Sequence, residues 1–141
     1  MKKIISLIAP LLVLCSCQTT KTKTVSHNYD DTKDSLITWR SIFTQDPDDY
    51  LVYFYSESCG HCNKIKQEVI SFYLKDLIDM YFVCTDFDAV YGTQKDLTGV
   101  DSLDDFYIFG TPFLSRITDH KVSEYYLGTN AIKNYINQFK N

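Results

Sequence analysis

The stretch Val52-Tyr-Phe-Tyr-Ser-Glu-Ser-Cys-Gly-His-Cys62 decides the fold prediction. It begins inside the apolar run Tyr50–Tyr55, which has the length and the aromatic and β-branched content of a strand. A continuous apolar run suits a strand that is buried on both faces of an α/β sheet. Apolar residues at helical spacing follow over residues 65–77. The sequence therefore predicts a strand, a tight turn that carries two cysteines, and a helix that begins at them.

Two cysteines at a helix start suit redox chemistry. The helix N-terminus carries unpaired N–H groups and a partial positive charge, which favour a thiolate at Cys59. Only the thiolate attacks a disulfide. His61, when protonated, adds positive charge beside this sulfur and lowers its pKa further. We expect Gly60 to let the backbone turn without steric cost. Cys62, one turn further in, would resolve the mixed disulfide formed by Cys59.

The rest of the chain predicts a small set of further elements. Residues 36–43 favour a short amphipathic helix, and residues 81–85 a second strand. The segment that follows shows no clear pattern and suits a long loop with a short helix in it. Residues 113–117 and 121–127 are typical of a hairpin, and residues 132–139 of a last helix. The predicted order is helix, strand, helix, strand, an irregular segment, strand, strand, helix.

These stretches resemble the thioredoxin family. Val52–Cys62 is similar to the family's active-site region, and its Cys-Gly-His-Cys form matches protein disulfide isomerase domains. Gly110–Pro112 resembles the family's cis-proline loop, and Glu124–Gly128 resembles its last strand. The resemblance covers Leu36–Phe139. It implies an α/β thioredoxin fold, with a central mixed sheet of four to five strands and helices on both faces.

The resemblance also implies roles for single residues. Thr111 would offer backbone groups to an extended substrate, as in strand addition. Pro112, beside the cysteine pair, would keep metals out of the dithiolate site. The family usually carries a buried carboxylate six residues before the first cysteine, but here that position is Tyr53. This difference puts efficient proton transfer to and from Cys62 in doubt. Ser58 replaces the family's usual tryptophan, so we expect a different substrate surface.

The N-terminus has the features of an export signal. Residues 1–3 are a short basic region, and the largely apolar residues 4–14 are too few to cross a bilayer. Leu14-Cys15-Ser16-Cys17 resembles the bacterial lipoprotein box, with small Ser16 before the cysteine that is lipidated. Cys15 fits this pattern less well, because bulky Leu14 would sit at the cleavage site. The alternative is a plain secretory signal.

This interpretation divides the chain into three parts. Residues 1–16 are a lipoprotein signal peptide, residues 17–34 a flexible spacer after lipidated Cys17, and residues 35–141 a thioredoxin-like domain. Either kind of signal places the domain outside the cytoplasm, where disulfides form and persist. We expect a monomer that is lipid-anchored to a bacterial membrane.

Composition narrows the function classes. The 141 residues allow one domain, and 45% apolar and 23% charged residues are ordinary for a globular protein. A net charge of −4 gives no basic footprint for nucleic acid. There is one CxxC motif, and His27 and His120 lie outside any ligand spacing, so we predict neither a metal site nor a cofactor. Cys84 suits a buried thiol without a partner.

The leading hypothesis is a thiol–disulfide oxidoreductase that acts on exported proteins through Cys59 and Cys62. A membrane electron carrier is a candidate redox partner. A thiolate stabilised by His61 favours an oxidant or isomerase, whereas many tethered bacterial relatives are reductants, so the sequence leaves the direction open. The absence of a carboxylate at Tyr53 motivates a second hypothesis, a non-catalytic thioredoxin-fold adaptor. A metal chaperone is the third.

Overall fold

Strand β1 (Asp49–Tyr55) is the apolar run on which the prediction rests, and every residue in it after Asp49 is buried. It lies inside the sheet, because it pairs in parallel with β2 (Asp79–Cys84) and antiparallel with β3 (Phe113–Thr118). The computed structural model that shows this describes residues 25–139. The prediction of a strand buried on both faces is confirmed.

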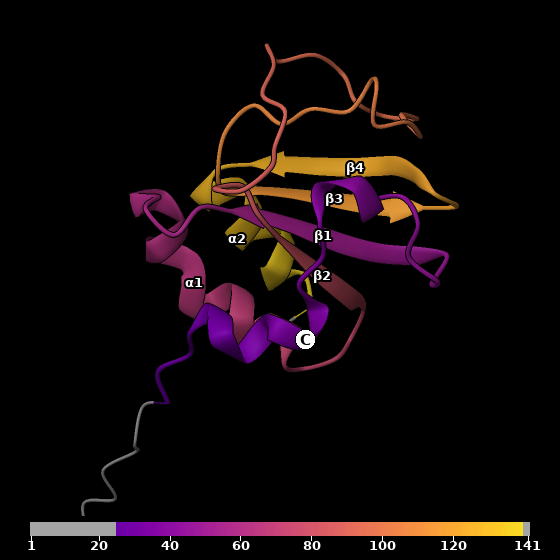
Figure 1. The fold of residues 1–141 in the computed structure, drawn as a ribbon. Coiled ribbons are helices and arrows are strands. Elements are labelled where there is room, and N and C mark those ends of the chain that lie inside the picture. Colours follow the sequence, from indigo (N-terminus) through magenta and orange to yellow (C-terminus); the bar gives the residue numbers. More distant parts are fainter. Residues whose placement is uncertain (1–24, 140–141) are drawn as a thin grey trace, which may run out of the picture.

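The sheet has four strands in the order β2-β1-β3-β4 (Figure 1). Strand β4 (Lys121–Leu127) pairs antiparallel with β3, which confirms the predicted hairpin. Helix α1 (Gly60–Tyr73) connects the parallel strands β1 and β2, and helix α2 (Thr129–Asn137) follows β4. Gly128, between β4 and α2, has a φ of 84°, a value that glycine adopts most readily. The sheet is therefore mixed, as the resemblance implied.

Both α-helices pack on one face of the sheet. Their buried side chains join those of Leu51, Tyr53 and Phe82 in one apolar cluster, and Cys62 belongs to it. The 3-10 helix η1 (Tyr29–Ser35) reaches the same face, since Tyr29 packs against this cluster. Because Cys62 is part of this core, packing of the helices on the sheet positions the second cysteine.

The opposite face is covered differently from what the resemblance implied. Here the short 3-10 helix η2 (Trp39–Ser41) and the irregular segment of residues 85–112 replace an α-helix. Between its two ends, over residues 86–111, three side chains are buried and anchor the segment, those of Leu97, Phe106 and Ile108. These anchors have no helical spacing, which explains why the sequence predicted no clear element there.

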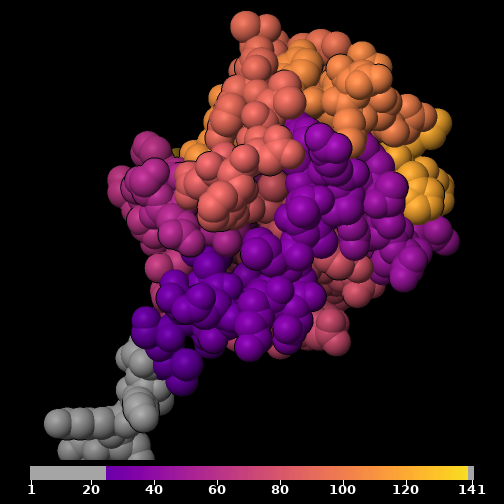
Figure 2. Space-filling model, in the orientation of Figure 1, coloured from indigo at the N-terminus to yellow at the C-terminus, as the bar shows by residue number. Residues whose placement is uncertain are grey.

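The structure corrects the predicted spacer. Residues 29–35 form η1, in which Thr32 is buried, and the Tyr29 ring stacks on Tyr55 with 3.7 Å between ring centroids. The backbone N–H of His27 donates to Gln67 Oε1 at 2.7 Å, and Gln67 Nε2 donates back to the His27 carbonyl at 2.5 Å. Figure 2 shows this indigo segment packed onto the body of the domain.

The folded part therefore begins near residue 27, and the flexible spacer predicted to extend to residue 34 is wrong over its last eight residues. The predicted signal and Cys17 lie outside the described residues. Within residues 25–139, no helix combines the length and the apolar character needed to cross a bilayer.

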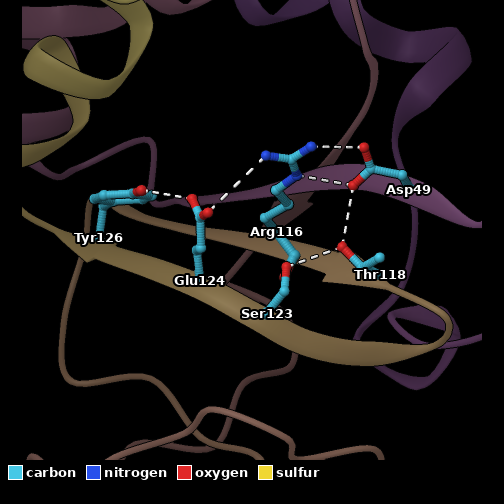
Figure 3. A network of polar contacts seen from close by, with 6 residues as sticks. All are labelled: Asp49, Arg116, Thr118, Ser123, Glu124 and Tyr126. Atoms are coloured by element: carbon cyan, nitrogen blue, oxygen red, sulfur yellow. Dashed lines mark hydrogen bonds and ion pairs between the residues drawn. The ribbon is translucent and has the colours of Figure 1, made fainter.

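A polar network ties the first strand to the hairpin (Figure 3). Arg116 on β3 donates from Nε and Nη2 to the two carboxylate oxygens of Asp49, at 2.8 and 2.7 Å. Thr118 Oγ1 donates to Asp49 Oδ1 at 3.1 Å, and Glu124 lies 4.0 Å from Arg116 Nη1. Hydrogen bonds from Arg116 are the main cause of a lowered pKa at Asp49.

We predict that Asp49→Asn lowers the free energy of unfolding at pH 7 by roughly 0.5–1 kcal/mol, because both partners are partly exposed to solvent. The lowered pKa means that the wild type has this stabilisation above the ordinary Asp value of 3.8 and loses it as the pH falls below that value. Urea unfolding at pH 7 and pH 3 measures the effect.

Asp48→Asn is the matched control, because Asp48 is the exposed neighbouring residue. Equal losses in the two variants, or an Asp49→Asn deficit that is as large at pH 3 as at pH 7, would contradict the prediction.

Candidate redox site

The two predicted cysteines are joined in a disulfide at the junction of β1 and α1. Their Cα atoms are 5.2 Å apart. Cys59 is the N-cap residue of α1, and its Sγ accepts the backbone N–H of Cys62 at 3.1 Å. Cys62 is fully buried, whereas Cys59 is partly exposed. A partner molecule can therefore reach the Cys59 sulfur and not that of Cys62.

Gly60 and His61 lie between the two cysteines. His61 is exposed on the first turn of α1. Gly60 is the first residue of α1, and a Cβ atom added there would meet nothing within 4 Å. Gly60 is also not among the residues with positive φ. Neither a nearby atom nor the backbone conformation therefore requires glycine at this position.

The loop before β3 reaches the cysteine pair across 52 residues. The Thr111–Pro112 peptide bond is cis, as the resemblance implied, and Pro112 is buried. The carbonyl oxygen of Thr111 lies 3.4 Å from Cys59 Sγ. The fold thus brings together Cys59, Cys62 and Thr111, which the sequence separates.

Asp86 is a further residue at the site that sequence reasoning missed. Its Oδ2 accepts the backbone N–H of Glu57 at 2.9 Å, across 29 residues. A hydrogen bond from the Ser56 side chain, followed by that from Glu57, lowers the Asp86 pKa, so the carboxylate is charged at neutral pH. Asp86 therefore holds the loop that leads into Cys59.

A signal for Asp86 exists in the sequence, because it follows the end of β2. The carboxyl ends of parallel strands lie at the same edge of a sheet, so the sequence predicts that Asp86 is close to the loop after β1.

The third cysteine in the described residues, Cys84, lies next to Asp86. Cys84 is free and buried, as predicted, and its Sγ is 3.5 Å from Asp86 Oδ2. Burial raises the pKa of the Cys84 thiol.

Tyr53, which stands where a carboxylate was expected, is fully buried in the same apolar cluster as Cys62. Its hydroxyl is fully buried. Among the described residues, no polar group lies at a distance and angle suitable for a hydrogen bond with it. Burial, with the neighbouring Tyr29, raises its pKa far above the ordinary range. Burial also raises the pKa of Tyr29 to about 12. Neither phenol can serve as a proton-accepting anion near neutral pH.

A groove of about 480 Å³ lies beside the disulfide. Thr111, Pro112 and residues 127–131 line it together with His61 and Lys64 of α1. Sequence reasoning identified the first two of these and His61, but not Lys64 or the start of α2. Among the described residues, no group of three or more His, Cys, Asp or Glu side chains is arranged to hold a metal ion.

We predict that Tyr53→Phe leaves the free energy of unfolding unchanged or raises it by up to about 1 kcal/mol, because it removes a buried hydroxyl that has no hydrogen-bond partner in the described part of the chain. Tyr50→Phe is the matched control, since the buried Tyr50 hydroxyl donates to the Ile42 carbonyl at 2.8 Å. Its loss costs about 1 kcal/mol. Urea unfolding of both variants tests this, and an equal loss in the two would show that Tyr53 has a partner.

Comparisons with known proteins agree with this geometry at the level of the fold. The chain is similar to the crystal structure of thioredoxin NaTrxh from Nicotiana alata, with a TM-score of 0.51, 14% identity, and coverage of 75% of this chain and 91% of that one. It is also similar to the thioredoxin of Malassezia sympodialis, with a TM-score of 0.51, 13% identity, and coverage of 75% and 92%. No family model and no curated protein sequence matches the chain. The chain has the thioredoxin fold, with a disulfide of CxxC spacing at the start of its first α-helix.

Proposed function

We propose that the protein is a thiol–disulfide oxidoreductase whose reactive groups are Cys59 and Cys62. One observation carries this proposal: the disulfide pairs Cys59, a partly exposed residue at a helix N-terminus, with Cys62, which is fully buried. The accessible sulfur can exchange with a partner while the second sulfur remains protected. Such an asymmetric pair is suited to exchange through a mixed disulfide.

The reaction starts from the disulfide that the structure contains. A client thiolate attacks Cys59 Sγ, and the bond between Cys59 and Cys62 breaks, leaving its electron pair on Cys62 as a thiolate. A second client thiolate then attacks the client sulfur of the mixed disulfide and releases Cys59 as a thiolate. The client gains a disulfide and loses two electrons, which remain on the Cys59–Cys62 dithiol. The reverse sequence reduces a client disulfide.

The residues around the pair support both steps. The Cys62 N–H and the positive end of α1 stabilise a thiolate on Cys59. The Thr111 carbonyl next to Cys59 Sγ offers an acceptor to the backbone of an extended client. Asp86 keeps the preceding loop in place. The buried Cys62 thiolate must obtain its proton from a group other than Tyr53, whose pKa lies too high for exchange near neutral pH.

Stabilising the Cys59 thiolate stabilises the dithiol form and raises the reduction potential. We therefore propose that the protein oxidises or isomerises client disulfides. A potential near about −180 mV, as in protein disulfide isomerase, supports this direction, and one near about −270 mV, as in thioredoxin, indicates a reductase. A reductase would require a membrane electron carrier to renew its dithiol.

The proposed clients are exported proteins, and the proposed location is the outer side of a bacterial membrane. The lipoprotein-like sequence Leu14–Cys17 supports this location. The folded part begins near His27, so a tether attached at Cys17 would hold the domain close to the membrane surface.

A non-catalytic adaptor is the second candidate function. The buried Tyr53 favours it, because no Asp or Glu is buried among the described residues to move a proton for Cys62. The two functions differ in one respect: an adaptor keeps its biological effect when both cysteines are changed to serine.

We predict that Cys62→Ser accumulates mixed disulfides with clients through Cys59, because the resolving thiol is lost. Cys59→Ser forms none, since Cys62 is buried. Non-reducing gels of cells that express each variant, with mass spectrometry of the trapped species, measure this. Cys84→Ser is the control, because that thiol lies outside the disulfide. Equal trapping by both variants, or by neither, argues against an oxidoreductase.

We predict that Cys17→Ser removes the protein from the membrane fraction, whereas Cys15→Ser leaves it there. Metabolic labelling with a fatty acid and membrane fractionation compare the two variants. Labelling that depends on Cys15, or that is absent from the wild type, contradicts lipidation at Cys17.

A further inference from the structure

The groove beside Cys59 has a defined position relative to the reacting sulfur. One wall is the cis Thr111–Pro112 loop, and the Thr111 carbonyl is 3.4 Å from Cys59 Sγ. His61 and Lys64, on the first turns of α1, also line the groove. A client segment that reacts at Cys59 and extends along this loop therefore passes near these two side chains.

The charges lining this groove differ from those of the chain as a whole. The chain has a net charge of −4, yet none of the residues that line the groove is acidic. Lys64 and His61 make no ion pair with any residue that the structure describes. Lys64 is exposed, so its ammonium group is free to meet a ligand.

Carboxylates near the disulfide lie outside the groove. Asp86 accepts the N–H of Glu57, which is in the loop that precedes Cys59, and both residues are exposed. Neither of them lines the groove, whereas Lys64 and His61 do. Such an arrangement of charges favours some client segments over others, according to the positions of the charged residues in the client.

The start of α2 adds to the positive potential of the groove. Its N-cap residue, Gly128, supplies no side-chain hydrogen bond, and its first turn contains no acidic residue. The positive end of the helix dipole is therefore not offset by a local carboxylate. This contribution adds to the side-chain charge of Lys64.

We propose that this groove selects client segments that carry a carboxylate side chain beside the reacting cysteine, with Lys64 as the residue that recognises it. The inference rests on the proposed function, because it names the substrate class of the same site. A carboxylate that follows the client cysteine into the groove gains an attraction that a neutral amide lacks. For charges this exposed, the expected preference is about two- to fivefold.

The test uses two cysteine peptides that differ only by Glu or Gln next to the cysteine. The rate constant for attack of each peptide thiol on the Cys59–Cys62 disulfide is measured by stopped flow. Because a neighbouring carboxylate changes the reactivity of a thiol, each rate constant is divided by that for the same peptide with oxidised dithiothreitol. We expect the corrected ratio, Glu over Gln, to be about two to five at low salt and to approach one at high salt.

Lys64→Gln should bring the corrected ratio close to one at low salt. Lys75→Gln is the matched control, because this substitution removes the same charge. Lys75 is exposed and lies beyond the far end of α1. This control should leave the ratio as in the wild type. A wild-type ratio near one, or a ratio that Lys64→Gln does not change, overturns the proposal.

The two proposals fail in different ways. If both peptides react at Cys59 but without a charge preference, the oxidoreductase stands and the acidic client class is rejected. If neither peptide forms a mixed disulfide with Cys59, the proposed function fails and this inference fails with it.

Discussion

The burial of β1 on both faces of the sheet is the constraint on which the rest of the structure depends. Its side chains alternate between the two apolar clusters, so Tyr53 packs with the α-helices and Phe54 packs under the irregular segment. Its backbone pairs with β2 on one side and β3 on the other. A strand held in this way has one position and one register. The loop and helix that follow it therefore start from a fixed point, and they carry both cysteines.

Three segments distant in sequence meet at that point. The α1 N-terminus supplies the N–H that Cys59 Sγ accepts, the loop before β3 supplies the Thr111 carbonyl, and the end of β2 supplies Asp86. Each contact acts on the loop between β1 and α1, which is otherwise exposed. Polar contacts around the loop thus preorganise the site, while Cys62 belongs to the apolar core and Cys59 packs against it.

The site differs from the expected pattern in its buried polar groups. A carboxylate under the cysteine pair would be costly to bury but could exchange protons, whereas Tyr53 is neutral and its hydroxyl has no hydrogen-bond partner among residues 25–139. Exposed charged residues lie around the site instead, with Glu57 and Asp86 at the loop before Cys59 and His61 and Lys64 in the groove. Electrostatic control of this site is therefore exerted from its surface, where salt and client charge can modify it.

The sequence by itself determined the strand, the cysteine pair at a helix start, the hairpin and the resemblance of Gly110–Pro112 to a cis-proline loop. These features depend on local periodicity and spacing, which neighbouring residues encode. The position of Cys62, one turn further in than Cys59, was also predicted from the sequence, and the structure shows that Cys62 is fully buried. Only the tertiary structure decided that Asp86 holds the loop and that Lys64 lines the groove.

The tertiary structure also determined the conformation of two segments whose sequences have no periodic pattern. Residues 27–34 contain few apolar side chains, yet Tyr29 finds Tyr55 as a stacking partner, and a pair of amide hydrogen bonds joins His27 to Gln67. Residues 85–112 are held by isolated anchors such as Phe106. In both cases the stabilising contact lies tens of residues away along the chain. The local sequence does not identify such a partner, because the two residues come into contact only when the chain folds.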